Sequence, residues 1–251
     1  MKTLVVLPTY NEIQNLAPMT AAILEAVPGT HILVVDDNSP DGTGGLADEM
    51  AQKHPGKVHV LHRQEKNGLG PAYLAGFAWA VKQGYEGVVQ MDADFSHPVA
   101  LIPQLLKGLE QRHLALASRY IKGGGTRNWG VLRRFISRGG NLYARMILHL
   151  GIKDLTGGFK AYRREVLEFL LGCPIQSKGY HFQIETTARA VTQGYSFTEV
   201  PFIFEERRAG KSKMDRGIFF EATVQTLKLK FLLGKSRKSP DPAINSLRVS
   251  P

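Results

Sequence analysis

The sequence predicts an α/β protein with a largely parallel central sheet and helices on both of its faces. Through the first 120 residues, short apolar runs alternate with amphipathic segments, and this alternation is typical of strand–helix–strand units. Groups of polar residues follow four of the apolar runs, as in parallel sheets that bind ligands at one edge. The length of 251 residues suits one large domain that needs no cross-links.

The expected strands in this first part are short runs rich in Val, Leu and Ile, which are typical of strands buried on both faces. The expected helices have apolar residues at helical spacing, so that one side of each helix can pack on the sheet. We expect strands at residues 3–8, 31–37, 57–62, 87–92 and 114–119, and helices at residues 11–26, 43–53, 71–83 and 99–110.

The alternation stops after residue 120. Residues 121–130 are expected to form a glycine-rich loop, and residues 131–150 a basic amphipathic helix that is interrupted at Gly139–Gly140. Glycine is a poor helix former, and two in succession favour a break. We then expect a turn, a short strand and a helix within residues 154–171, a helix at 179–194, a strand at 197–204, a charged loop at 205–215 and a helix at 217–233.

Four polar loops are expected at the carboxyl edge of the sheet, where ligands of such folds bind. They are "PTYNE", "DDNSPDGT", "DADFSHP" and "SRY", after the first, second, fourth and fifth strands. In "DADFSHP", Asp92 and Asp94 are two residues apart, so both side chains can face one side. Paired carboxylates suit Mg²⁺ or Mn²⁺, with phosphate oxygens completing the coordination. Aspartates that only form a turn are the alternative, which the neighbouring polar loops disfavour.

The loop after the second strand combines two expected roles. Asp36 and Asp37 end that strand, where a carboxylate can accept hydrogen bonds from a base or ribose. Asp41, Gly42 and Thr43 are expected to form a turn and a helix cap. Neither a G-x-G-x-x-G after the first strand nor a G-x-x-x-x-G-K-[ST] occurs, which disfavours a dinucleotide oxidoreductase and a P-loop NTPase.

The positive charge is concentrated in the middle of the chain. The net charge is +10, yet residues 1–110 carry a net −5, residues 111–153 a net +9 without one acidic residue, and residues 154–251 a net +6. Such a block indicates an anionic partner, for which nucleic acid, phospholipid and phosphorylated small molecules are candidates.

Other sequence signals bear on location. The lone Cys173 excludes an internal disulfide and is expected to be a core thiol in a reducing compartment. The first residues lack the pattern of a secretory signal. No apolar run of about 18 residues occurs, so no transmembrane helix is predicted.

Taken together, the motifs resemble the inverting GT-A glycosyltransferases of family 2, and most closely the polyprenyl- or dolichyl-phosphate mannose synthases. The resemblance extends over nearly the whole chain, as far as the final helix. It implies a three-layer, Rossmann-like GT-A fold with a mixed, mostly parallel sheet. The motifs that carry it are "PTYNE", "VVDDNSPDGT", "EKNGLGPAY", "MDADFSHP", "SRY", "LRRFISRGGN", "DLTGGFKAYRR", "GYHFQIE" and "FEERRAGKSK".

The resemblance implies a role for several residues. The donor would be GDP-mannose, the acceptor a polyprenyl phosphate, and the cofactor Mg²⁺ or Mn²⁺ held by Asp92 and Asp94. Arg133 and Ser137, one helical turn apart, would bind the acceptor phosphate. Ser96 stands where some relatives have a Gln that also binds the metal, so its role stays open. The implied donor-binding residues are Pro8, Tyr10, Glu12, Val35, Asp37 and Ala93. Arg119 would contact phosphate or sugar, and Arg207 and Lys213 would belong to a mobile loop that closes over the diphosphate.

The implied domain organisation is a GT-A catalytic domain over residues 1–214, a C-terminal amphipathic helix over 215–234 and a flexible basic tail over 235–251. The helix would pack either on the domain or on an anionic membrane surface, so the protein is expected in the cytoplasm, peripherally bound to the cytoplasmic face of a membrane. His97 and His181 are expected to be structural, because a phosphate nucleophile is already anionic and needs no strong base.

Two alternatives remain. Another sugar donor such as UDP-glucose would fit the same fold. A nucleic-acid-binding protein is disfavoured, because the basic block has few interleaved aromatic residues and the aspartate pair would be unexplained. The sequence does not specify the lipid chain length, the oligomeric state or any protein that anchors the chain to a membrane.

Overall fold

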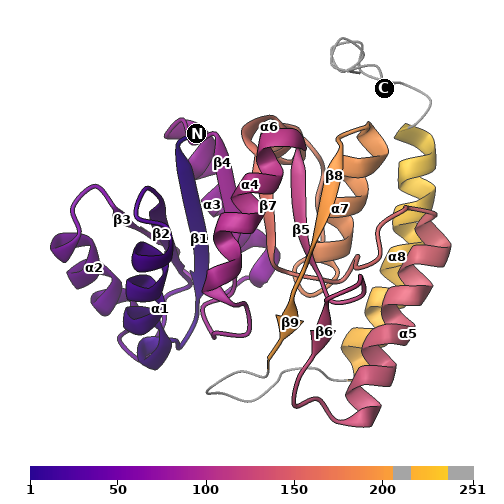
Figure 1. Cartoon of the computed structure of the whole chain (residues 1–251), viewed down its shortest axis with the longest axis horizontal. Coiled ribbons are helices and arrows are strands. Elements are labelled where there is room, and N and C mark those ends of the chain that lie inside the picture. Colours follow the sequence, from indigo (N-terminus) through magenta and orange to yellow (C-terminus); the bar gives the residue numbers. More distant parts are fainter. Residues whose placement is uncertain (206–215, 237–251) are drawn as a thin grey trace.

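The structure of the protein is a computed structural model, and it describes residues 1–205 and 216–236. A seven-stranded sheet forms its centre, in the order β3-β2-β1-β4-β7-β5-β8, and helices cover both faces (Figure 1). The strands are β1 (Thr3–Thr9), β2 (His31–Asp36), β3 (Val58–His62), β4 (Gly87–Gln90), β5 (Leu114–Ser118), β7 (Lys160–Arg163) and β8 (Phe197–Pro201).

The sheet is mixed and mostly parallel, as predicted. β7 alone among its strands runs antiparallel, and it lies between β4 and β5. β1, β2, β4 and β5 are largely apolar runs that are buried on both faces, as in Leu4–Leu7 and Ile32–Val35. Such runs form strands because each face packs on a layer of helices.

One face of the sheet packs against α1 (Ile13–Ala26), α2 (Thr43–Lys53), η1 (Val99–Leu101) and α4 (Ile102–Gln111). The other packs against α3 (Leu69–Lys82), α6 (Arg164–Leu171) and α7 (Phe182–Gln193). The predicted helices of the first half thus exist at nearly the predicted places. α3 begins at Leu69 rather than residue 71, because a proline is tolerated in the first turn of a helix.

Two long helices, α5 (Val131–Leu148) and α8 (Arg216–Ser236), lie side by side on the side of the sheet where β8 is the edge strand (Figure 1). The Tyr143 hydroxyl donates to the Thr223 carbonyl, 3.1 Å away, and so joins them. Leu229 and Leu233 of α8 belong to the buried core. Among the helices of the described residues, none is long and apolar enough to cross a membrane.

The predicted interruption of the basic helix at Gly139–Gly140 is wrong, because α5 is continuous through both glycines. A helical glycine costs only about 1 kcal/mol relative to alanine. Contacts of the residues that follow the glycines offset that cost: Ala144 and Leu148 pack into the core, and the Asn141 side chain is hydrogen-bonded to the backbone of Lys153 and Leu155. Tertiary packing therefore overrides the local propensity.

The strand predicted at residues 197–204 is two strands. β5 ends at Ser118, which pairs with Pro201 at the end of β8. β8 ends there as well, with the Phe202 N–H donating to the Ser118 carbonyl at 3.2 Å. The chain then pairs as β9 (Ile203–Phe204) with β6 (Gly125–Thr126). β6 lies in the segment predicted to be only a glycine-rich loop. The resulting β6–β9 ribbon extends from the same end of the sheet as the start of α5 (Figure 1).

Candidate active site

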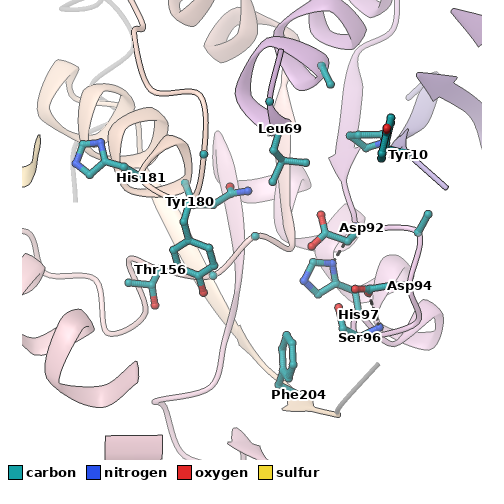
Figure 2. A pocket seen from close by; sticks show the side chains of 18 of the residues that line it. Tyr10, Leu69, Asp92, Asp94, Ser96, His97, Thr156, Tyr180, His181 and Phe204 are labelled. Carbon is teal, nitrogen blue, oxygen red and sulfur yellow. Dashed lines mark hydrogen bonds between the residues drawn. The ribbon is translucent and has the colours of Figure 1, made fainter. Parts of the chain in front are cut away.

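A cavity of about 540 Å³ opens at the carboxyl edge of the sheet (Figure 2). Its walls come from the loops after β1, β2, β4 and β5, the first turns of α3 and α5, the residues before α7, and α8. Most of the predicted site residues therefore meet in one place. Those that line the cavity are Pro8, Tyr10, Glu12, Asp37, Asp92, Ala93, Asp94, Ser96, Arg119, Arg133 and Ser137.

The loops after β1 and β2 are joined into one wall by hydrogen bonds from backbone to side chain. Asn11 N–H donates to Ser39 Oγ at 3.1 Å, and Glu12 N–H donates to Thr43 Oγ1 at 3.0 Å. Asp41 Oδ1 accepts from the backbone N–H of Thr43 at 3.0 Å, as expected of a turn residue. These bonds fix the backbone that carries the predicted donor-binding side chains.

The two aspartates at the end of β2 have different environments. Asp36 is buried and accepts from the Thr9 hydroxyl at 2.9 Å and the Ser39 hydroxyl at 2.6 Å, so it holds the loop together. Asp37 lines the cavity and pairs with Arg63, with 2.5 Å between Oδ1 and Nη1. Burial raises the pKa of the Asp37 carboxyl, and the lowering effect of Arg63 only partly opposes this. Val35 belongs to the core, and its side chain does not line the cavity.

Asp92 and Asp94 lie in a loop, because β4 ends at Gln90, two residues earlier than predicted. The Tyr73 hydroxyl donates to Asp92 Oδ1 at 2.8 Å. The backbone N–H of Asp92 donates to Nδ1 of His97 at 3.1 Å, and that of Ser96 donates to Asp94 Oδ1 at 3.0 Å (Figure 2). Both carboxylates line the cavity and are held by neighbouring groups, one from α3 and one within the loop.

This loop fits a hard divalent cation that completes its coordination from elsewhere. No group of three or more His, Cys, Asp or Glu side chains with metal-binding geometry exists within residues 1–205 and 216–236. Two carboxylates are the usual protein contribution to an Mg²⁺ site, where substrate phosphates and water supply the remaining oxygens. The residues present therefore suit a metal that binds together with a phosphorylated ligand.

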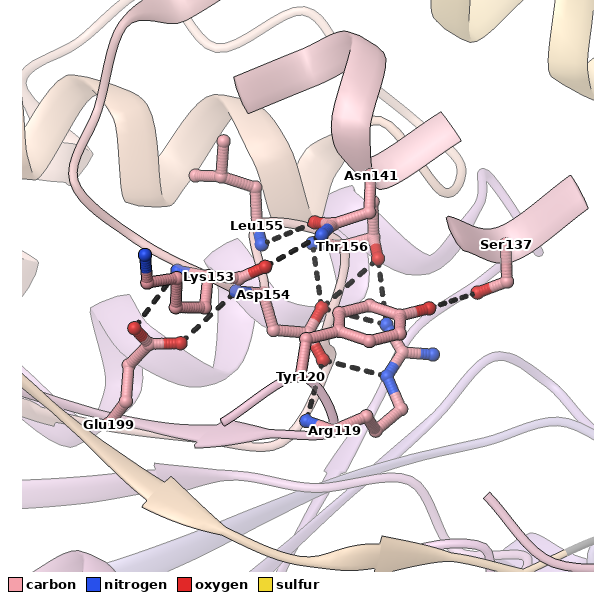
Figure 3. A network of polar contacts seen from close by, with 9 residues as sticks. All are labelled: Arg119, Tyr120, Ser137, Asn141, Lys153, Asp154, Leu155, Thr156 and Glu199. Carbon is pink, nitrogen blue, oxygen red and sulfur yellow. Dashed lines mark hydrogen bonds and ion pairs between the residues drawn. The ribbon is translucent and has the colours of Figure 1, made fainter. Parts of the chain in front are cut away.

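Arg119 is held by a buried ion pair that the sequence did not indicate. Its Nε and Nη2 donate to the two carboxylate oxygens of Asp154 at 2.7 and 2.8 Å, and Nη2 also donates to Thr156 Oγ1 at 2.7 Å (Figure 3). Burial favours the neutral form of each partner, but their mutual attraction outweighs it, so the pKa of Arg119 is raised and that of Asp154 lowered. The predicted contact of Arg119 with phosphate or sugar stays a prediction.

Arg133 and Ser137 lie on the first turns of α5, and both line the cavity. The Ser137 hydroxyl is 2.8 Å from that of Tyr120 (Figure 3). The Arg133 guanidinium lies over the ring of Trp129, 4.4 Å from its centroid. The same cavity thus joins the carboxylates of the β4 loop to the two residues that were predicted to bind the acceptor.

Sequence reasoning missed the segment before α7, of which residues 178–181 line the cavity. The start of α3 fixes it: Gly70 N–H donates to the Lys178 carbonyl at 3.0 Å, and a side chain at Gly70 would collide with the Ser177 carbonyl. The "GLG" of residues 68–70 was the available signal. Glu185 accepts from the Ser177 hydroxyl at 2.5 Å, and His181 Nδ1 lies 2.8 Å from the same oxygen.

Lys66 was also missed. Its ammonium lies 3.6 Å from the centroid of the Tyr10 ring, in the wall formed by the predicted donor-binding residues. The predicted site residues Arg207 and Lys213 lie outside the described residues.

The sheet order, the cavity at its carboxyl edge and the paired carboxylates fit the glycosyltransferase fold expected from the sequence, and the comparison with protein families agrees. The model described as "Glycosyl transferase family 2" matches residues 4–171. The chain belongs to this family, and it is a glycosyltransferase.

Two curated relatives are similar over most of the chain. The polyprenol monophosphomannose synthase of Mycolicibacterium smegmatis is 50% identical over 222 residues, which cover 88% of this chain and 84% of the relative. The undecaprenyl-phosphate mannosyltransferase of Micrococcus luteus is 46% identical over 224 residues, which cover 89% and 92%.

Solved structures support the fold. Glucosyl-3-phosphoglycerate synthase from Mycobacterium tuberculosis, in complex with Mn²⁺, UDP and glucosyl-3-phosphoglycerate, matches with a TM-score of 0.66 at 19% identity, covering 96% of this chain and 81% of that one. Its complex with Mn²⁺, UDP-glucose and phosphoglyceric acid matches with a TM-score of 0.66 at 20% identity and the same coverage. The GT-A arrangement expected from the sequence is thereby confirmed.

Proposed function

We propose that this glycosyltransferase transfers mannose from GDP-mannose to a polyprenyl monophosphate, with inversion at the anomeric carbon. The observation that carries the proposal is the 50% identity, over 88% of the chain, to a polyprenol monophosphomannose synthase. The cavity supports it, because Asp92 and Asp94 line the same space as Arg133 and Ser137, which belong to the segment 111–153 that has no acidic residue.

In this proposal the donor half of the cavity holds the nucleotide. Pro8, Tyr10, Glu12 and Asp37 surround the guanosine, and Asp92 and Asp94 hold Mg²⁺ or Mn²⁺ against the diphosphate. The metal would neutralise charge on the departing diphosphate. Arg119 contacts phosphate or sugar through the part of its guanidinium that Asp154 does not use. From the resemblance, Arg207 and Lys213 also bind the diphosphate.

The acceptor half supplies the nucleophile, a phosphate oxygen that is anionic at neutral pH. The oxygen bonds to the anomeric carbon as the bond to the diphosphate oxygen breaks, so GDP leaves from the opposite face. No strong general base is needed. The electrostatic problem is to bring two anions together, and Arg133 together with the Ser137 hydroxyl offsets the charge of the acceptor.

A peripheral position on the cytoplasmic face of a membrane completes the proposal. α5 and α8 expose large apolar side chains at their surfaces: Phe135 is 78% exposed and Phe231 is 73% exposed. Arg134, Arg138, Lys228 and Lys230 are exposed on the same two helices. Apolar and basic side chains together suit an anionic lipid surface, which would bring the lipid tail of the acceptor to the start of α5.

The test is incubation of the purified protein with labelled GDP-mannose, polyprenyl phosphate and Mg²⁺ or Mn²⁺. Labelled lipid should form, and Asp92→Ala and Asp94→Ala should each abolish it. Absence of labelled lipid with the wild type, or undiminished turnover in both variants, would refute the mechanism. Thermal shift in Mn²⁺ compares donors, and equal or larger stabilisation by UDP-glucose than by GDP-mannose would refute the proposed donor.

A further inference from the structure

Trp129 lies close to two arginines that line the same cavity. The Arg133 guanidinium carbon is 4.4 Å from the centroid of its ring, and that of Arg119 is 5.9 Å away. Trp129 is only 7% exposed, yet it lines the cavity. Its indole N–H is buried and has no hydrogen-bond acceptor among the residues that the structure describes. Ring packing, rather than a protein hydrogen bond, therefore accounts for where Trp129 lies.

The backbone around Trp129 is fixed on both sides. Before it, Arg127 N–H donates to the Phe204 carbonyl at 2.9 Å, which anchors the segment to the β6–β9 ribbon. Asn128 then adopts a left-handed conformation, with φ of 58°, a geometry that asparagine tolerates better than most residues. After it, α5 begins at Val131. The backbone on both sides of Trp129 is therefore held in place.

The indole also packs against other aromatic rings. Trp129 meets Phe204 edge to face at a centroid distance of 5.1 Å, and Phe204 meets His97 in the same manner at 6.2 Å. His97 is the residue whose Nδ1 accepts from the Asp92 N–H. A continuous row of rings thus connects the carboxylate loop to the arginine of α5.

We propose that Trp129 is the positioning residue for the acceptor phosphate: its indole face holds the Arg133 guanidinium so that the edge of the guanidinium meets the anionic acceptor. The inference rests on the proposed function for the identity of the acceptor. A guanidinium stacked on a ring keeps its in-plane N–H donors available for an oxyanion. Stacking also restricts a long side chain that otherwise loses rotamer freedom on binding.

The energetic size of the effect follows from cation–π contacts. A guanidinium over an indole gains about 0.5–1 kcal/mol at an exposed site and about 2 kcal/mol when desolvated. Trp129 is buried and Arg133 is half-buried, and a value of about 1 kcal/mol corresponds to a roughly 5-fold change in affinity. Farnesyl phosphate, a short polyprenyl phosphate, serves as the acceptor in these tests. We expect Trp129→Leu to raise the KM for farnesyl phosphate about 5- to 10-fold and to leave the KM for GDP-mannose within about 2-fold. Trp129→Phe keeps a ring under Arg133 and should stay within about 3-fold of the wild type.

A double-mutant cycle with Arg133→Ala separates positioning from folding. Arg119 is held by its own hydrogen bonds to Asp154 and Thr156. Once Arg133 is removed, Trp129→Leu therefore releases no guanidinium that depends on the indole, and it should cause no further loss of acceptor use. If Trp129 only stabilised the fold, its effect would persist in that background and would appear equally in donor binding. Additive effects of the two substitutions would overturn the inference.

Fluorescence gives a readout that does not depend on turnover. The chain has two tryptophans, and Trp79 packs on His59 and Tyr85 away from the cavity, so Trp79→Phe leaves Trp129 as the lone emitter. Farnesyl phosphate should then change the emission with saturation, whereas farnesol, which lacks the phosphate, should not. No change at farnesyl phosphate concentrations that saturate turnover would overturn the inference.

The two proposals can fail separately. A fluorescence change with farnesyl phosphate, but no mannosyl lipid under any donor, would refute the proposed function and keep Trp129 at an anion site. Normal mannosyl transfer with an unchanged acceptor KM in Trp129→Leu would keep the function and refute the role of Trp129.

Discussion

Arg119 and Asp154 form a buried, bidentate ion pair that connects the end of β5 to the loop before β7. Both side chains are almost completely inaccessible, at 2% and 0% exposed. Asp154 Oδ2 accepts from both the backbone N–H and the Nε of Arg119, at 3.0 and 2.7 Å. The pair holds one wall of the cavity in place, because Arg119 and its hydrogen-bond partner Thr156 both line the cavity.

Replacement of Asp154 by Asn should therefore be strongly destabilising. It leaves the Arg119 charge buried without a counter-charge, which typically costs about 3–5 kcal/mol in the free energy of unfolding. Denaturant titration measures this loss. The matched control is Glu168→Gln, which breaks the exposed pair with Arg164 and should cost no more than about 0.5 kcal/mol. Similar losses in the two variants would contradict the buried character of the pair.

Tyr73 is expected to set the orientation of Asp92, a carboxylate that we propose binds the metal. Its hydroxyl donates to Asp92 Oδ1 at 2.8 Å, and burial, followed by the Asp92 charge, raises the pKa of Tyr73 well above its usual value. Tyr73→Phe should raise the Mn²⁺ concentration for half-maximal activity by about 10-fold, as loss of a group that orients a ligand does.

The control for Tyr73 is Tyr195→Phe, which removes a hydroxyl that donates to the Glu165 carbonyl outside the cavity. Its Mn²⁺ dependence should match the wild type. Wild-type Mn²⁺ dependence in Tyr73→Phe would mean that Asp92 does not need this hydrogen bond.

Gly70 is expected to be irreplaceable at the start of α3. A methyl group there would collide with the Ser177 carbonyl, and backbone cannot yield as a flexible side chain can. Gly70→Ala should lower the free energy of unfolding by about 2 kcal/mol and reduce turnover, because it displaces the segment before α7. In Gly45→Ala, a helical site with open space around it, stability should instead rise by about 0.5–1 kcal/mol. The same sign in both variants would refute the steric argument.

The fold could be predicted because its signals are local. Each buried strand is a short apolar run, and polar loops follow these runs in the sequence, so the carboxyl edge was predicted. Most of the site residues that the family resemblance implied do line the cavity there. The break at Gly139–Gly140 was predicted wrongly because local propensity ignores the packing of Ala144 and Leu148.

The missed features of the site depend on contacts between distant parts of the chain. Arg119 and Asp154 are 35 residues apart, and the β6–β9 ribbon joins segments on either side of α5, β7 and α7. Neither periodicity nor residue spacing reveals such pairs. The position of Val35 shows the converse: a residue implied by resemblance can carry its side chain into the core.

Membrane association should depend on the exposed phenylalanines of α5 and α8. Phe231→Ser removes an apolar side chain that would enter the interface and should reduce binding to vesicles with anionic lipid by about 10-fold, since burial of such a side chain contributes about 1.5–3 kcal/mol. Vesicle co-sedimentation measures this. Ile13→Ser, at an exposed residue of α1, is the control and should bind as the wild type does. Equal binding by the wild type, Phe231→Ser and Ile13→Ser would refute the proposal that this surface binds the membrane.

Lys160 should make stability depend on pH above neutrality. It is 1% exposed, and its ammonium donates to the Gln183 carbonyl at 2.6 Å and to Thr187 Oγ1 at 2.8 Å. Burial lowers the pKa of Lys160 to about 7, from an ordinary value of 10.5. Between those two values the unfolded chain holds a proton that the folded protein has released, so the free energy of unfolding rises with pH.

The expected slope from this one group approaches about 1 kcal/mol per pH unit between pH 7 and 10, with no contribution below pH 7 where both states are protonated. Urea titrations at pH 7, 8 and 9 measure it as the difference between the wild type and Lys160→Met, which has no titrating group at this position. The exposed Lys107 provides the control, since Lys107→Met should retain the wild-type slope. Parallel profiles for the wild type and Lys160→Met would show that Lys160 does not release its proton on folding in this range.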